Sequence, residues 1–401
     1  MVLTNTILIL GAGATGSVCL HPRLLRSRLW HATVTPLASI IGSGFLVVGP
    51  ILSDTAGSSA WQAMVGLCLL GYLYGAAIRH NITYIEPRLG HLPRTAAGIE
   101  RISDLTLALS YFVSVSYYLN LLAAFALRSV GVIDPFHIHL LATGVIAAIG
   151  MIGMRGGLGA LEKLEVGTVG IKLAVIAGLL ASLAVAFGSA WSTHDLVISS
   201  GSKSQTDALR IILGLVILVQ GFETSRYLGE EYDRELRVRT MRLAQWVSSA
   251  IYIGFVFLIT HLFRDGIGAA GGETEIIDML KPLGVAIAPM LIMAALASQS
   301  SAAVADMNGA GGLINEVTRH RVPVKLGYLA TAIVAIFLTW SANIFEIITW
   351  ASKSFVAYYA LQSLQAALSA RSQGRWLQAG VFATGVLIAV VVIVWAVPAG
   401  A

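Results

Sequence analysis

Long apolar stretches follow one another along most of this chain, and short polar segments separate them. A membrane-spanning helix needs about 20 mostly apolar residues, so the pattern predicts an all-α integral membrane protein with about eleven spans. The expected spans cover residues 31–56, 58–79, 102–128, 137–154, 161–187, 207–230, 240–263, 282–306, 325–340, 343–368 and 375–398.

Two of these stretches are interrupted by glycine near the middle. Gly42-Ser43-Gly44 interrupts the stretch 31–56, and Gly221-Phe222-Glu223 interrupts the stretch 207–230. Glycine weakens a helix locally, and hydrocarbon cannot satisfy the backbone groups that a break exposes. A break persists only where it lines a protein cavity, so a pair of breaks indicates the binding site of a transporter.

The spans divide into two halves of similar design. Residues 31–187 hold five spans, residues 207–368 hold another five, and each half starts with its broken span. An odd number of spans per half forces the halves into opposite orientations, which is the inverted repeat common in secondary transporters. Span 375–398 lies outside the repeat and is expected at the periphery. Residues 1–30 are expected to form an N-terminal cytoplasmic extension.

The composition supports a membrane location. The chain is 56% hydrophobic and only 12% charged, with a mean hydropathy of +0.79, whereas soluble domains carry about 25% charged residues. Nineteen of the 26 Lys and Arg residues lie in segments on one side of the predicted topology and five on the other. The positive-inside rule places the basic side and the N-terminus in the cytoplasm. We therefore expect a bacterial or archaeal inner-membrane protein, and the net charge of +5 predicts no nucleic-acid partner.

Residues 11–16 read GAGATG, which matches the glycine fingerprint of dinucleotide-binding folds. That fold needs an acidic residue about 20 positions further on, and the first acid here is Asp54, beyond a membrane span. The two cysteines, Cys19 and Cys68, have neither the spacing nor the context of a disulfide or a metal site. We expect no cofactor, no metal and no catalytic constellation, so the chain is not expected to be an enzyme.

Three segments carry a resemblance to a known family. Residues 38–45, ASIIGSGF, resemble the first helix of the amino acid–polyamine–organocation (APC) superfamily. Residues 220–223, QGFE, with the acids at 230 and 231, look like its sixth helix, and residues 300–312 are similar to its eighth helix and the loop after it. With the topology, the resemblance covers residues 31 to about 370. It implies a broken-helix transporter, although Tyr232-Asp233 replaces the Asn-Pro that often follows the paired acids and leaves the substrate open.

The two ends of a broken helix suit the two charges of an amino acid. The N-terminal end of a half-helix presents unpaired N–H groups and a partial positive charge, and the other end presents carbonyl groups that suit an ammonium. We expect a substrate carboxylate near Ser43 and Gly44, and an amino group on carbonyls near Ser39 and Gln220. The resemblance implies the same arrangement. The alternative is that the glycines only allow close helix crossing.

Side chains near the breaks have open roles. Phe222 is either an aromatic cover over the substrate, as the resemblance suggests, or an ordinary apolar residue. Glu223 caps exposed amides, pairs with Arg226 or carries a proton. Asp306 is expected to be a solvated or loop-capping acid. Ser114 and Tyr117 share one face of their helix and either line the pocket or bond to other helices. The expected substrate-binding residues are Ser39, Gly42, Ser43, Gly44, Ser114, Tyr117, Gln220, Gly221, Phe222 and Glu223.

Lys172 lies deep in span 161–187. In several proton-coupled members of the superfamily, a lysine in helix 5 takes the place of a sodium ion between helices 1 and 8, and Lys172 matches that position. Its expected neighbours are carbonyls near Ser39 and the hydroxyls of Ser300 or Ser301. Burial makes an ammonium easier to deprotonate, which favours H⁺ over Na⁺ as the coupling ion. The alternative is a permanently charged tether in an exchanger or uniporter.

Lys353 occupies the matching place in the second half. Lys172 follows Gly42 by 130 residues, and Lys353 follows Gly221 by 132. We expect Lys353 beside Glu223, or facing the pocket to read an acidic substrate.

The sequence thus predicts a secondary active transporter of an amino acid or related small organic ion, coupled to H⁺ and working by alternating access. The alternatives are a transporter of the same fold for another solute, and a transport-dead membrane sensor or assembly subunit.

Overall fold

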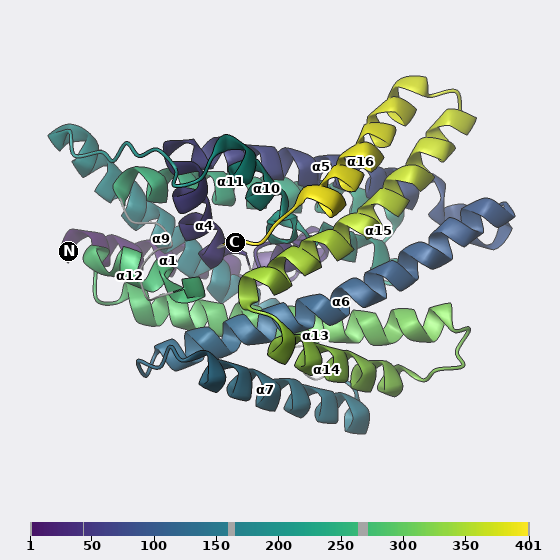
Figure 1. Ribbon diagram of the computed structural model, residues 1–401, viewed down its shortest axis with the longest axis horizontal. Helices are drawn as coiled ribbons and strands as arrows, with labels where there is room; N and C mark the ends of the chain where they lie inside the picture. Colours follow the sequence, from purple (N-terminus) through teal and green to yellow (C-terminus); the bar gives the residue numbers. More distant parts are fainter. Residues whose placement is uncertain (1, 43, 159–164, 264–271, 400–401) are drawn as a thin grey trace.

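Both predicted helix breaks are present in the computed structural model of the chain, whose ribbon is drawn in Figure 1. Helix α3 (Arg28–Ile40) ends before the first break, and α4 (Phe45–Ala56) begins after it. In the second, α10 (Gln205–Leu213) gives way to two 3₁₀ turns, η3 (Val216–Val219) and η4 (Phe222–Tyr227). The structure describes residues 2–42, 44–158, 165–263 and 272–399. Ser43 therefore lies outside the described residues.

Each of the nine unbroken spans corresponds to one helix within the described ranges, which confirms the predicted all-α class with two broken helices. Length and apolarity alone select eight membrane-crossing segments of the described chain, and α15 is not among them. The helices are α5 (Ala60–Tyr84), α6 (Arg94–Arg128), α7 (Pro135–Gly156), α9 (Glu165–Thr193), α11 (Arg234–Leu262), α13 (Ile287–Val317), α14 (Val324–Ser341), α15 (Ile344–Ser372) and α16 (Trp376–Trp395).

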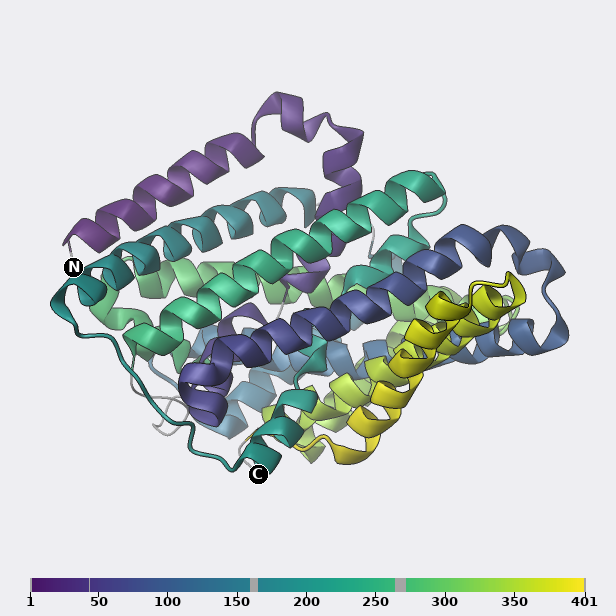
Figure 2. The ribbon, with the colours of Figure 1, turned by 90° about the horizontal axis from the view of Figure 1, so that it is seen from above.

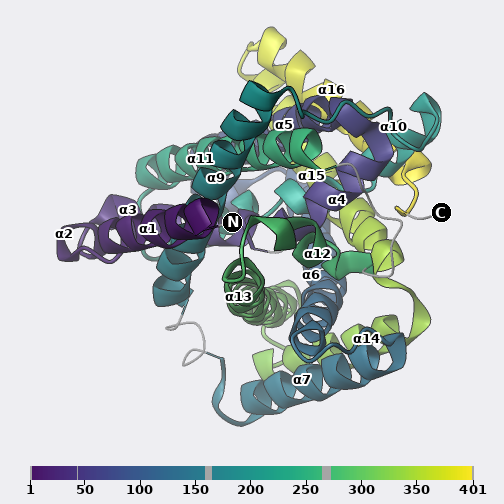
Figure 3. The same cartoon turned by 90° about the vertical axis from the view of Figure 1, so that its left-hand side faces the viewer.

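Helix α6 holds the centre of the bundle. It packs against α13 and α15, while α7 and α14 pack on each other along one side. Figure 3 looks along the helices and shows α7 and α14 together at the lower edge. Helix α11 packs against α5, α3 and α4. The short helix α12 (Ile276–Leu280) precedes α13. The two breaks therefore lie between the α5–α11 side and the α6–α13 side.

One end of the bundle gathers the basic connections, and we call it the basic end. It includes the start of α6, the α13–α14 connection and the α15–α16 connection, on the right-hand side of Figure 1. These segments carry Arg94, Arg319, Arg321, Arg371 and Arg375. The basic residues that the sequence assigned to one side of the membrane thus cluster in space.

Most of the expected N-terminal extension is helical. Helix α1 (Val2–Cys19) lies alongside α9 (Figure 2) and runs antiparallel to it. Ser182 Oγ donates to the Thr4 carbonyl at 3.0 Å, whereas Leu20 reaches Gly170 near the other end of α9. The start of α1 therefore lies at the end of the bundle opposite the basic end.

The glycine motif of residues 11–16 serves this packing. A Cβ on Gly11 would lie 3.1 Å from the Gly178 Cα, and a Cβ on Gly178 would lie 2.4 Å from the Leu8 carbonyl oxygen. Paired glycines let two helix backbones approach closely, as small residues do in membrane helix pairs. The motif lies within a helix, so it does not form the phosphate-binding turn that its spacing resembles.

Candidate functional site at the helix breaks

The two breaks touch each other in the middle of the bundle. Gly221 has a φ of +113°, in the left-handed region that favours glycine. A Cβ there would lie 2.6 Å from the carbonyl carbon of Ser39, and a Cβ on Gly44 would lie 2.6 Å from Leu218. The structure therefore brings Gly221 against Ser39 and Gly44 against Leu218, and each close approach depends on glycine.

Lys172 reaches the first break from α9. Its Nζ donates to the Ala38 carbonyl at 3.1 Å, and the side chain is only 3% exposed. Ser298 on α13 donates to the Gly42 carbonyl. A cavity of about 20 Å³, with room for a single water, lies among Gly42, Lys172 and Ser298. Lys172 thus ties α9 to the last turn of α3, and Ser298 ties α13 to the break that follows it.

Two hydroxyls expected beside Lys172 take other roles. Ser300 donates back to the Leu296 and Ala297 carbonyls of its own helix, and Ser301 is half-buried. Successive helical residues are about 100° apart, so Ser298 and Ser300 point to different faces of α13. The sequence identified the correct helix, but Ser298 and not Ser300 reaches the first break.

Glu223 caps the second break. Its Oε2 accepts from the Gly221 N–H at 3.0 Å and from the Tyr359 hydroxyl at 2.8 Å. Phe222 is fully buried and stacks on Tyr359, with ring centroids 5.1 Å apart. Tyr359 also stacks on Tyr74 at 5.1 Å. The carboxylate and the aromatic ring of η4 are therefore both held by α15.

Helix α6 lines the opposite side of the breaks. Gln220 Nε2 donates to the Tyr118 hydroxyl at 2.9 Å, and Tyr117 is fully buried beside Tyr118. Ser114 donates to Asp306 on α13. Asp306 is only 3% exposed, so the expectation of a solvated or loop-capping acid is wrong. Helix α13 continues to Val317, which leaves Asp306 within the helix rather than at its end.

Lys353 does not take the place expected from the repeat. It is half-exposed, and it makes no hydrogen bond or ion pair with any residue that the structure describes. Its neighbour Ser352 occupies the matching position instead. Ser352 donates to the Gly214 carbonyl at 2.7 Å and accepts from the Ile217 N–H at 3.0 Å. Ser352 thus ties α15 to the second unwound segment, whereas Lys172 ties α9 to the last turn of α3 before the first.

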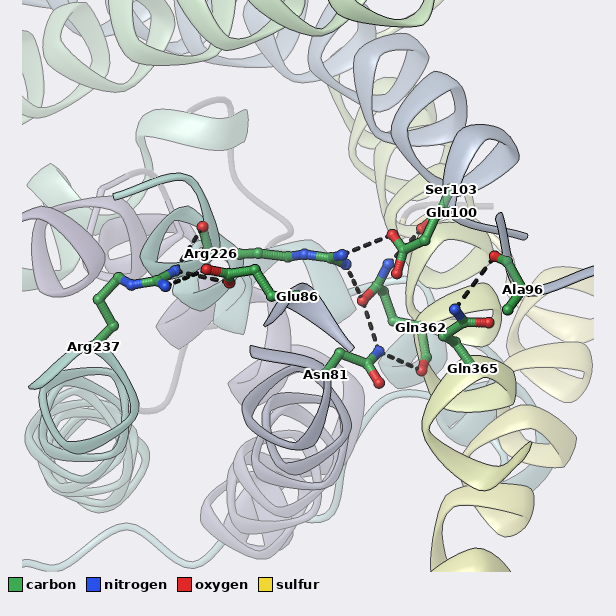
Figure 4. A network of polar contacts seen from close by, with 9 residues as sticks. All are labelled: Asn81, Glu86, Ala96, Glu100, Ser103, Arg226, Arg237, Gln362 and Gln365. Atoms are coloured by element: carbon green, nitrogen blue, oxygen red, sulfur yellow. Dashed lines mark hydrogen bonds and ion pairs between the residues drawn. The ribbon is translucent and has the colours of Figure 1, made fainter. Parts of the chain in front are cut away.

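A buried polar network joins η4 to α6 and α15 between the second break and the basic end (Figure 4). Arg226 on η4 forms an ion pair with Glu100 on α6, with Nη2 and Oε2 2.7 Å apart. Arg226 also donates to Gln362 on α15. Gln362 Nε2 donates to Ser103 on α6 at 2.7 Å, and Asn81 on α5 donates to the Gln362 side chain at 2.9 Å.

Arg237 extends this network to α11. It forms an ion pair with Glu86 and donates to the Arg226 carbonyl at 2.9 Å. The network therefore joins the α5, η4 and α11 side of the bundle to the α6 and α15 side. Sequence reasoning missed it, although a buried Gln362 within an apolar span is a signal of functional polarity.

Comparisons with known proteins agree with this geometry. A family model described as APC superfamily transporter matches residues 22–396. The chain belongs to the APC superfamily of transporters. An uncharacterized protein of Aquifex aeolicus (strain VF5) is 43% identical over 352 residues, covering 86% of this chain and 85% of that protein. The solved structure of a Na⁺-coupled sialic acid symporter superposes with a TM-score of 0.55 at 14% identity, over 99% of this chain and 98% of that one.

The family match of this APC transporter starts after α1. Residue 22 follows the helix Val2–Cys19, so the helix that packs on α9 lies outside the matched region. The broken helices, Lys172 and the polar network at the basic end all lie inside it.

A larger cavity lies away from the breaks. It measures about 500 Å³ and lies between α6, α7 and the α14–α15 connection, with Asn120, His139, Trp340 and Glu346 in its walls. Its lining includes no residue of either break.

Proposed function

We propose that this APC transporter carries an amino acid or a related small organic ion, coupled to H⁺, by alternating access. The observation that carries the proposal is the Lys172 contact with the Ala38 carbonyl. A buried ammonium on a carbonyl of the last turn of α3 can hold α3 to α9 when charged and release it when neutral. Release of that tie would couple proton transfer to movement of the broken helix.

Sodium is the competing coupling ion. The sialic acid symporter with the same fold is Na⁺-coupled, so uptake driven by a sodium gradient must be compared directly with uptake driven by a pH gradient. The Lys172 ammonium already supplies a positive charge beside the first break, and a second cation there would be repelled. This electrostatic argument favours H⁺.

The polar network at the basic end supports alternating access. It joins the two sides of the bundle through buried groups, so the site is sealed on that side in this state. The positive-inside rule assigns the basic end to the cytoplasm. Opening toward the cytoplasm then requires Arg226 to leave Glu100.

Uptake into proteoliposomes tests the proposal. The purified transporter is reconstituted into lipid vesicles. The flux of radiolabelled amino acids is then measured with a pH gradient, with a sodium gradient and with neither. Accumulation that needs the pH gradient supports H⁺ coupling, and accumulation that needs only sodium contradicts it. Absence of flux for every amino acid favours another solute or a transport-dead sensor.

A further inference from the structure

A groove runs between α5 and α11 on the outside of the bundle. It has a volume of about 250 Å³, and its walls come from these two helices alone. Both helices are long and apolar enough to cross a membrane, and Figure 3 shows them on the opposite side of the bundle from α7 and α14. Leu69 and Trp246 in the walls are exposed. In a membrane, the groove therefore opens toward the lipid.

The same two helix faces continue from the groove toward the basic end. Groove residues 65, 69 and 72 of α5 are followed at the same spacing by 76 and 79, and groove residues 253, 249 and 246 of α11 are followed by 242 and 239. Residues three or four apart share a helix face. The continuation therefore carries Arg79 on α5, and Arg242 and Arg239 on α11.

Two contacts place this continuation at the basic end. Arg375, in the α15–α16 connection, donates to the hydroxyl of Tyr84 at the end of α5, at 2.6 Å. Arg234, at the start of α11, donates to the Thr83 carbonyl of α5 at 3.2 Å. The groove thus leads from the apolar middle of the bundle to the end that carries the basic connections.

Arg79 is buried without a counter-charge. It is only 6% exposed, and it forms no ion pair within the part of the chain that the structure describes. Its guanidinium donates to the Gln245 side chain and to the Tyr72 carbonyl, and lies 4.6 Å from the centroid of the Tyr72 ring. These partners are neutral. A buried charge without a counter-charge is costly, so an anion beside Arg79 stabilises this region.

Arg242 adds a second positive charge at the same place. It is exposed, it lies within electrostatic range of Arg79, and among the described residues it has no acidic partner. Two guanidinium groups this close repel each other. A phosphate between them removes the repulsion, and guanidinium groups match phosphate geometry well.

The connection between the groove and the charges favours a lipid over a soluble anion. Tyr72 and Gln245 hold Arg79, and both also line the groove. Tyr72 packs edge-on against Trp246, with ring centroids 6.2 Å apart, where the apolar walls give way to the arginines. Tyr and Trp are typical of that boundary in membrane proteins. Basic pockets between membrane helices on the cytoplasmic side bind anionic headgroups.

We propose that an anionic phospholipid binds between α5 and α11, with an acyl chain in the groove and its phosphate at Arg79 and Arg242. The positive-inside rule assigns this headgroup to the cytoplasmic leaflet. The lipid joins the two helices and supplies the counter-charge that the protein does not. The site is separate from both helix breaks and does not depend on which solute is transported.

Lipid-induced stabilisation of the purified full-length transporter in detergent tests this site. The probes are phosphatidylglycerol, phosphatidylcholine with the same acyl chains, and glycerol 3-phosphate as a phosphate without chains. A specific ligand raises the melting temperature by mass action. We expect phosphatidylglycerol to raise it at concentrations at which the other two probes do not.

Two variants locate the bound lipid. Arg242→Gln removes an exposed charge, and we expect it to weaken phosphatidylglycerol binding roughly fivefold. Ser249→Phe fills the groove without changing any charge, and should weaken binding as well. Arg321→Gln removes an exposed arginine in the α13–α14 connection at the same end, so it serves as the matched control and should leave binding unchanged. Melting curves without added lipid show which variants are folded.

Several outcomes overturn the inference. Equal stabilisation by the two phospholipids shows that the arginines do not select the headgroup. Equal stabilisation by glycerol 3-phosphate and phosphatidylglycerol shows that a soluble anion suffices. A folded Arg242→Gln variant that responds to phosphatidylglycerol as Arg321→Gln does shows that the lipid binds elsewhere. No response of the wild type to any of the probes contradicts the site itself.

Discussion

Arg226 and Glu100 form a buried ion pair between η4 and α6, with 2.7 Å between Nη2 and Oε2 and each side chain less than 8% exposed. Arg226 follows Glu223 by three residues on the same 3₁₀ turn. In a 3₁₀ helix, residues three apart lie on the same side. One short element therefore carries both the carboxylate at the second break and the arginine that closes the basic end.

The variant Glu100→Gln tests this closure. It leaves the Arg226 guanidinium buried without its counter-charge, which costs about 3–5 kcal/mol for a buried pair. We expect a lower melting temperature and greater exposure of the basic end to impermeant thiol reagents, measured on a cysteine at Ser103. Glu235→Gln changes an exposed acid near the same end and should alter neither.

Removing both charges of the pair should restore part of the stability that Glu100→Gln loses. Glu100→Gln combined with Arg226→Gln should recover part of the lost melting temperature, because no unpaired charge remains. If the double variant is as unstable as the sum of the single variants, the two residues act independently and the pair does not close the basic end.

The variant Lys172→Met tests proton coupling. It removes the ammonium that donates to the Ala38 carbonyl while keeping an apolar side chain of similar length. We expect pH-gradient-driven accumulation to fall by about tenfold or more, the factor that about 1.4 kcal/mol represents, while exchange of substrate across the membrane continues. Uptake and counterflow in proteoliposomes measure the two activities separately.

Lys353→Met is the matched control, because Lys353 makes no polar contact with the described part of the chain. It should leave accumulation and exchange unchanged. Loss of exchange as well as accumulation in Lys172→Met would identify Lys172 as a structural tether instead of a coupling residue.

Much of the fold followed from the sequence, since glycine breaks and apolar lengths are local properties of the chain. The Lys172 contact was also predictable, because a lysine within an apolar span must find a partner. Side-chain contacts between different helices were harder to predict. Ser298 and Ser300 are both hydroxyls on one helix, and only the rotation of α13 against α3 decides which one reaches Gly42.

Helix α1 shows another limit of the sequence. The spacing of its glycines matches a dinucleotide-binding motif that the missing acidic residue excludes, and only the partner Gly178 reveals that they form a helix contact. The prediction for Lys353 was wrong for a related reason. The repeat located the matching position on α15 to within one residue, but Ser352 and not Lys353 faces the break.

The contact between α1 and α9 can be tested by adding a single methyl group. Gly178→Ala places a Cβ 2.4 Å from the Leu8 carbonyl oxygen, so the two helices must separate. We expect destabilisation of about 1–3 kcal/mol, as for other overpacked interiors, seen as a lower melting temperature. Gly13→Ala, where no atom lies within 4 Å of the new Cβ, should not destabilise; equal melting of both variants would show that α1 does not pack there.

The direction of α1 predicts where the N-terminus lies. Because α1 runs antiparallel to α9, Thr4 lies near the start of α13, and Arg26 lies at the other end, in the basic segment of residues 21–28. If residues 21–28 are cytoplasmic by the positive-inside rule, α1 crosses the membrane and Thr4 lies outside, contrary to the cytoplasmic location that the sequence suggested for residues 1–30. In intact cells, a membrane-impermeant maleimide should label Leu3→Cys at once and Arg26→Cys only after permeabilisation. The native Cys19 and Cys68 are buried and give little background. Labelling of Leu3→Cys only after permeabilisation would return the N-terminus to the cytoplasm and exclude a membrane-crossing α1.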